Sequence, residues 1–342
     1  MIEIDESVLR ELIYHKISVN EAESVYSDGI YTYQNVDEME IMKKIFLKPF
    51  LSNTTTYEFT HGIDIDLNVL FKLAKDIQNG NDFVQVSKQI GQHLQMVSKH
   101  PNIKDGDLFV VKIDQISLNG DQFDGIGIFK IENKESFIET STITSKQSGF
   151  SLKKGIGARK LDKACLILFT DAPYTIFVID NAPIETDYWQ NEFLKLTLKK
   201  DHINHTNQFL TLAKTFVTEK FPTEFEVTKA DQIDFLNRSV EYFKSHDNFD
   251  KKEFEDEVFQ DQGIIQSFRK FDSAYKIENN LEIEDDFSIS AQAVKKQAKI
   301  FKSVLKLDKN FHIYIHGDRE LIEQGQEKDG RKYYKIYFEN ES

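Results

Sequence analysis

The stretch from Phe150 to Lys163, FSLKKGIGARKLDK, gathers side chains that could bind phosphate. Its basic residues are Lys153, Lys154, Arg159, Lys160 and Lys163, and its one acid is Asp162. Lysine and arginine provide positive charge and N–H donors for phosphate oxygens. Gly155 and Gly157 permit unusual backbone angles, so backbone N–H groups could also approach an oxyanion. These residues predict a site for phosphate or nucleic acid; a solvated turn with ordinary surface lysines is the alternative.

The stretch does not match the standard nucleotide-binding motifs. KKGIGARK lacks the four-residue gap and the Gly-Lys-Ser/Thr ending of a P-loop. GIGARK has no third glycine opening a helix, as a dinucleotide fingerprint requires. A lysine-rich loop offers point charges and few fixed donors for base edges, so we expect contacts to backbone phosphates without sequence preference.

The charge of the whole chain limits where such contacts can occur. The 342 residues include 43 Lys and Arg against 57 Asp and Glu, a net charge of −14. A field of this sign repels nucleic acid over most of the surface. Among consecutive blocks of fifty residues, only 151–200 is net positive, with 8 basic and 6 acidic residues. Any contact with nucleic acid should therefore use this local patch.

A second group of residues could support metal-dependent catalysis. Asp121 and Asp124 precede Glu132 and Lys134, and the last two share a face if they lie on a strand. An aspartate followed by Glu-x-Lys on an adjacent strand is how nucleases hold Mg²⁺ and a water molecule. A plain ion pair along one strand face is the alternative. A Mg²⁺-dependent nuclease therefore stays open as an alternative function, although we expect no enzyme activity, metal or cofactor.

Two further motifs favour structural roles. In DHINH, His202 and His205 could share a helix face, but Asp201 is better placed as the N-cap of that helix. Cys165 is the only cysteine and lies in the apolar run KACLILF, which predicts a buried, inert thiol. A single cysteine also excludes an intrachain disulfide bond.

Hydrophobic periodicity predicts the elements that position these residues. Helical spacing covers residues 36–51, 65–80 and 82–100, whereas alternation predicts strands at 107–116, 126–133, 136–144, 163–170 and 174–180. The first two strands should form a β-hairpin. The basic stretch lies between strands, so we expect it to be a loop that emerges from a sheet.

The second half of the chain shows mainly helical spacing, from about Asp187 to residue 280. A helix over 290–307 and a hairpin formed by 310–316 and 332–339 should close the chain. The predicted class is α+β, with an N-terminal mixed sheet domain with helices (1–184), a helical region (185–280) and a C-terminal helix plus β-hairpin (281–342). An acidic interaction module at 187–280, docking onto basic DNA-handling proteins, is a third hypothesis.

The N-terminal sequence MIEIDESVLRELIYHKI lacks the positive charge and apolar run of a signal peptide. No window approaches the roughly 20 apolar residues of a membrane span. We therefore expect a cytoplasmic protein with no membrane contact.

An ordered set of segments resembles the bacterial nucleoid-associated protein family of the NdpA type. The segments are GDLFVVKI, FSLKKGIGARKLDKACLILF, YW-x₃-FLKL with KKDHINHTNQFL, and FHIYIHGDRELIEQG with YYKIYF. The resemblance spans nearly the whole chain and implies a nucleoid-localised protein that binds double-stranded DNA and has no established catalytic residues. Nucleoid or DNA-handling proteins and a second copy of the chain are further expected partners. The contact residues that we expect, from charge alone, are Lys153, Lys154, Gly155, Gly157, Arg159, Lys160 and Lys163.

Overall fold

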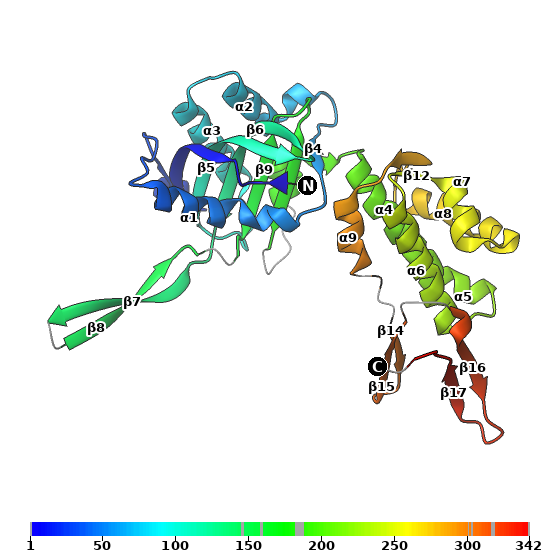
Figure 1. The fold of residues 1–342 in the computed structure, drawn as a ribbon. Helices are drawn as coiled ribbons and strands as arrows, with labels where there is room; N and C mark the ends of the chain where they lie inside the picture. Colours follow the sequence, from blue (N-terminus) through cyan, green and yellow to red (C-terminus); the bar gives the residue numbers. More distant parts are fainter. Residues whose placement is uncertain are drawn as a thin grey trace. The chain divides into compact units, whose positions relative to one another are not determined.

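The computed structural model describes residues 2–144, 147–157, 160–181, 188–299, 301, 304–315 and 319–340. The chain forms two compact units, residues 1–199 and 200–342, coloured blue to green and green to red in Figure 1. Helices, one large antiparallel sheet and small hairpins confirm the α+β class.

An antiparallel sheet organises the first unit. Its described strands are β1 (Ile2–Glu3), β2 (Val8–Ile17), β3 (Val25–Tyr26), β4 (Tyr57–Phe59), β5 (Gly106–Leu118), β6 (Asp121–Ile131), β9 (Lys163–Leu168), β10 (Thr175–Asp180) and β11 (Leu196–Leu198). The spatial order is β11-β4-β10-β9-β6-β5-β2-β3, and β1 pairs with the end of β5. The expected hairpin is confirmed as β5–β6. Its two-residue turn places Asn119 and Gly120 at φ of 56° and 95°, as a turn matched to the strand twist requires.

Helices cover both faces of this sheet. Residues of α2 (Val69–Gln78) and α3 (Phe83–Val97) share one core with one face, and α1 (Val36–Phe46) shares a second core with the other. In β9, Cys165 and Ile167 enter the first core, whereas Leu166 and Leu168 enter the second. Burial on both faces explains why this strand is apolar along nearly its whole length. Cys165 is fully buried, as expected, and burial raises the pKa of its thiol, which disfavours the reactive thiolate.

The basic stretch is not a loop throughout, as we had expected. Residues Gln147–Gly155 form β8, which pairs antiparallel with β7 (Glu135–Thr144). These two strands pair with each other and not with the large sheet (Figure 1). We call this two-stranded element the β7–β8 ribbon. The first half of the basic stretch is therefore strand, and only its second half connects the ribbon to β9.

The second unit is mainly helical. Between residues 200 and 299 its α-helices and strands are α4 (His202–Thr215), α5 (Phe221–Glu224), α6 (Lys229–Ser245), β12 (Asn248–Asp250), α7 (Lys251–Phe254), α8 (Gln262–Glu278), β13 (Asp286–Ser288) and α9 (Ala291–Ala298). Asp201 is the N-cap of α4, as predicted, and accepts a hydrogen bond from the backbone N–H of Asn204 at 2.9 Å. The core of this unit is rich in phenylalanine: Phe209 and Phe249 have ring centroids 4.2 Å apart.

The ends of the second unit differ in part from the expectation. Tyr188–Leu194 is helical, as the spacing predicted, but it clusters with the first unit, in which β11 pairs with β4. The expected helix over 290–307 stops at α9, and Val304–Leu307 form β14, which pairs with β15 (Phe311–Tyr314).

The last expected strand, 332–339, does not pair with 310–316 as predicted. It belongs to a second hairpin. It joins β16 (Ile322–Gln326) to β17 (Lys332–Ile336). Strand pairing between near neighbours requires less loop ordering than the long connection that we expected. No helix among the described residues is long and apolar enough to span a membrane.

Candidate nucleic-acid interface

The β7–β8 ribbon presents two different faces. Cross-strand partners share a face, and the register pairs Ile138 with Leu152 and Thr140 with Phe150. Ile138, Leu152 and Phe150 are 62 %, 74 % and 73 % exposed, so one face displays an apolar patch. Phe137 pairs with Lys153 on the opposite face. One face thus carries the apolar patch with Lys154 near its end, whereas the other carries Glu139, Lys153 and Phe137.

The expected contact residues Lys153 and Lys154 lie near the end of β8 and are exposed. The ammonium group of Lys153 lies 3.5 Å from a carboxylate oxygen of Glu139. Both side chains are about half exposed, so this ion pair contributes little stability and can exchange for another anion. Lys154 is on the other face, across from Ser136. The two ammonium groups therefore start from opposite faces of the ribbon.

Neighbouring side chains leave little room for a side chain at Gly155 or Gly157. A Cβ atom at Gly155 would lie 2.8 Å from the ring of Phe137, and one at Gly157 would lie 2.8 Å from the carboxylate of Glu135. Neither glycine has a positive φ. Close packing against the Phe137 ring accounts for Gly155, whereas the flexible Glu135 carboxylate could move away from a side chain at position 157.

The remaining cations of the stretch differ from one another. Lys160 is exposed, and Arg159 lies outside the described residues. Lys163, which we expected at the surface, is only 1 % exposed and pairs with Asp180 at 2.7 Å. It is the first residue of β9, directly opposite Asp180 at the end of β10. A buried ammonium group held by a carboxylate cannot grip phosphate, so Lys163 is not part of the candidate interface.

A buried charged cluster lies next to the start of the ribbon. Lys130 and Lys163 are cross-strand neighbours, and both ammonium groups approach the ring of Tyr188, at 5.4 and 5.0 Å. Lys130 also pairs with Glu132 at 2.9 Å and donates to the backbone oxygen of Lys104 at 2.8 Å. Burial lowers the pKa of Lys130 despite its carboxylate partner. Each of the two ammonium groups already has a carboxylate partner. The cluster therefore has a structural role in the sheet and is not a candidate ligand site.

Asp162 anchors both ends of the ribbon, a role that the sequence did not reveal. One of its carboxylate oxygens accepts hydrogen bonds from the backbone N–H groups of Glu132 and Asn133, at 2.8 and 2.9 Å. The other accepts from the side-chain amide of Asn133 at 2.8 Å. Asn133 precedes β7 and Asp162 follows β8, so this contact fixes the two chain segments that enter and leave the ribbon.

The residues of the nuclease hypothesis do not come together. Asp121 and Asp124 lie near the start of β6, whereas Glu132 and Lys134 follow its end. A strand rises about 3.3 Å per residue, so the two pairs are separated by more than roughly 20 Å. Lys134 instead pairs with Asp107 at 2.7 Å, and Asp124 accepts from the backbone N–H of Gln115 at 3.1 Å. These residues cannot share a metal ion.

A sheet covered by helices on both faces, with a projecting basic ribbon, defines an α+β protein with a candidate polyanion-binding surface. The family model described as nucleoid-associated protein YejK matches residues 13–337, nearly the whole chain. The chain therefore belongs to this family of bacterial nucleoid-associated proteins, which confirms the resemblance and the expected nucleoid location in the cytoplasm. No curated protein matches the chain.

Proposed function

We propose that the protein binds double-stranded DNA, without sequence preference, through the cations at the root of the β7–β8 ribbon. The observation that carries this proposal is the exposure of Lys153, Lys154 and Lys160 within a few residues of one another, in a chain of net charge −14. Arg159 is included from the sequence. Lysine ammonium groups contact phosphates as point charges, so binding should release counterions and weaken with salt.

Membership of the family supports a nucleoid-associated role without catalysis. The separation of the β6 carboxylates from Glu132 and Lys134 argues against the proposed nuclease site. We further propose that a second copy of the chain, or a DNA-handling protein, uses the apolar face of the ribbon. Isolated two-stranded ribbons are marginally stable in water, and the exposed side chains of Ile138, Phe150 and Leu152 would gain stability from a partner.

The test is the binding of fluorescent duplex DNA, followed by anisotropy over a series of salt concentrations. The triple variant Lys153→Ala, Lys154→Ala and Lys160→Ala is compared with the wild type. A control variant removes the same charge from exposed lysines of the second unit: Lys309→Ala, Lys328→Ala and Lys332→Ala. The slope of log affinity against log salt changes by about 0.9 for each phosphate contact. Removing three lysines should therefore reduce the magnitude of this slope by up to about 2.7 in the ribbon variant.

The possible results separate the hypotheses. Loss of affinity and slope in the ribbon variant alone supports the proposed interface. Equal losses in both variants would indicate a general effect of net charge, and equal binding by all three proteins would place the DNA contacts elsewhere. If the wild type does not bind, its nucleoid association runs through proteins. The acidic second unit, with 20 acidic and 13 basic residues in 201–300, is then the candidate surface.

A further inference from the structure

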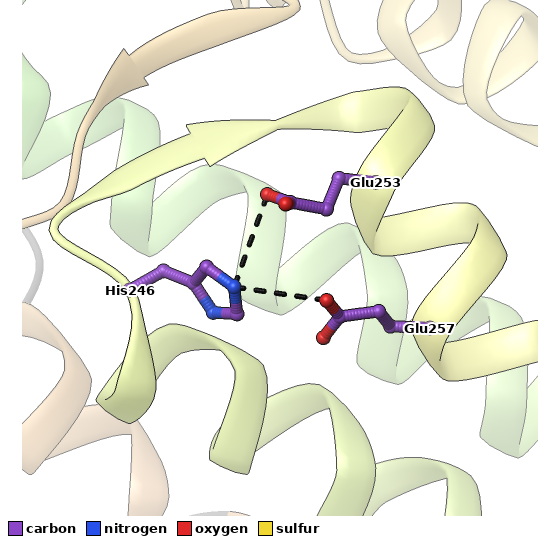
Figure 2. A group of neighbouring side chains, drawn as sticks. All are labelled: His246, Glu253 and Glu257. Atoms are coloured by element: carbon purple, nitrogen blue, oxygen red, sulfur yellow. Dashed lines mark ion pairs between the residues drawn. The ribbon is translucent and has the colours of Figure 1, made fainter.

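Three side chains of the second unit place metal-binding atoms close together at its surface, apart from the ribbon. His246 follows the end of α6, Glu253 lies in α7, and Glu257 lies in the π-helical turn that continues α7. Figure 2 shows the imidazole of His246 facing both carboxylates. Its Nε2 atom lies 3.9 Å from Oε2 of Glu253 and 3.7 Å from Oε1 of Glu257. One ligand atom from each residue lies within 4.8 Å of the other two.

The orientation of the His246 ring suits metal ligation. Its Nδ1 atom lies 2.9 Å from the backbone oxygen of Tyr242, which can only accept, and 3.1 Å from Oγ of Ser245. In the tautomer with its hydrogen on Nδ1, the ring donates to this carbonyl and leaves the lone pair on Nε2. The ring also stacks on that of Tyr242, with centroids 4.2 Å apart. A metal-binding histidine is typically fixed in this way, with one N–H donated to a carbonyl and the other nitrogen directed at the ion. Nε2 is thus the atom presented to the carboxylates.

The first carboxylate is also held in place by groups outside the cluster. The hydroxyl of Tyr242 lies 2.9 Å from Oε2 of Glu253 and donates to it. The side chain of Asp250 caps α7 by accepting from the backbone N–H of Glu253 at 2.8 Å. One tyrosine therefore orients two of the three candidate ligands, the imidazole through its backbone oxygen and the carboxylate through its hydroxyl.

The second carboxylate, that of Glu257, places another negative charge beside Glu253, and a cation between the two would relieve their repulsion. Glu257 follows Glu253 by four residues, which places both side chains on one side of the helical segment. Two like charges at this spacing destabilise a helix unless a cation lies between them. A neutral imidazole would add a lone pair, rather than a proton, to the same space.

We propose that His246, Glu253 and Glu257 bind a first-row divalent metal ion, with water completing its coordination. One imidazole nitrogen and two carboxylate oxygens suit Zn²⁺ and Mn²⁺. Ligand atoms about 2.1 Å from a tetrahedral ion lie about 3.4 Å from one another. The two separations from Nε2, 3.7 and 3.9 Å, are slightly wider, and all three ligand atoms lie within 4.8 Å of one another. Rotations of the half-exposed glutamate side chains would bring the three atoms to the closer spacing. The ion would tie the end of α6 to α7 across the short strand β12.

The experiment is calorimetric titration of the chelator-treated full chain with ZnCl₂ and with MnCl₂. Glu253→Gln and Glu257→Gln each remove one ligand charge at an exposed position. Asp256→Asn is the matched control, because it removes the same charge from a neighbouring exposed position. We expect one saturable ion per chain in the wild type and in Asp256→Asn. Each glutamine variant should bind at least tenfold more weakly, in line with the loss of a ligand.

Thermal unfolding gives an independent readout. An ion that binds only the folded state raises the melting temperature by mass action. The metal should therefore stabilise the wild type and the control, and Glu257→Gln much less, while circular dichroism without metal verifies that the variants are folded. Absence of saturable binding by the wild type, or binding by both glutamine variants as tight as that of the wild type, would overturn the proposal.

Discussion

The side chain of Asp162 holds Asn133 at two points, accepting from its backbone N–H at 2.9 Å and from its side-chain amide at 2.8 Å. The two residues lie on opposite sides of the β7–β8 ribbon in the sequence. Removing the carboxylate would leave three N–H donors without their acceptor.

Asp162→Ala should therefore loosen the root of the ribbon. We expect it to lower the free energy of unfolding by about 2 kcal/mol, since hydrogen bonds to a charged group contribute about 1.5 to 3 kcal/mol. Urea denaturation measures the loss, and faster hydrogen exchange at Glu132 and Asn133 would localise it. Asp171→Ala, at an exposed turn, is the control. Unchanged exchange at both amides would contradict the anchoring role of Asp162.

Lys160 and Lys163 should respond in opposite ways to substitution. Lys163→Ala removes the ion pair between a buried ammonium group and Asp180, and should cost about 3 kcal/mol, the low end for a broken buried pair because Asp180 is partly exposed. It should leave the salt dependence of DNA binding unchanged. Lys160→Ala should change stability by less than about 0.5 kcal/mol and reduce the salt slope. Urea denaturation measures the stability of both variants, and anisotropy measures the salt dependence of their DNA binding. A reduced salt slope with unchanged stability in Lys163→Ala would mean that Lys163 reaches the surface.

His15 should make the first unit sensitive to acid. Burial, with a smaller effect of Lys88, lowers the pKa of its imidazole to about 4. Its Nδ1 accepts the backbone N–H of Ser27 at 3.1 Å, so a proton on that nitrogen would disrupt the bond. The unfolded state then binds more protons than the folded state between pH 6.5 and about 4, and stability is lost as the pH falls through that window.

The loss attributable to His15 is up to about 3 kcal/mol. It is measured as the difference in free energy of unfolding between pH 7.5 and 4.5. His15→Asn should show a smaller difference than the wild type, although it is less stable at pH 7.5. His100→Asn, at an exposed position, controls for the change of residue type. Equal pH dependence in wild type and His15→Asn would show that other groups cause the acid sensitivity.

Gly125 should tolerate no side chain. A Cβ atom there would lie 2.3 Å from the backbone oxygen of Ile167 on the neighbouring strand. Gly125→Ala should therefore cost at least about 2 kcal/mol, because the strands must shift. Gly62→Ala, where nothing lies within 4 Å of the added atom, should change stability by less than about 0.5 kcal/mol. Thermal melting of the two variants would decide, and similar melting temperatures would contradict the predicted clash.

Local patterns predicted much of the first unit. The alternating segments became β5, β6, β9 and β10, and Asp201 caps α4 as its chemistry indicates. Strand partners were harder to predict, because alternation identifies a face without naming the neighbour. β7 therefore looked like a sheet strand, and the pairing of β14 with β15 was missed.

The candidate site was predicted only in part, for a related reason. Charge located the exposed lysines, but it could not show that Lys163 is buried. A signal was available: Lys163 begins one apolar strand and Asp180 ends the next, so a hairpin of equal strands places them opposite each other. The metal-binding cluster had no such signal, because the turn through β12 brings His246 to the glutamates.

The two-faced ribbon also constrains the length of the chain. Successive strand residues point to opposite faces, so moving β8 by one residue would exchange every one of its side chains between faces. An insertion or deletion ahead of Phe150 would place Lys153 among the apolar side chains and turn Phe150 and Leu152 toward Glu139. Insertions in this ribbon should therefore occur in pairs of residues, whereas single substitutions are limited only by the chemistry of the face on which they fall.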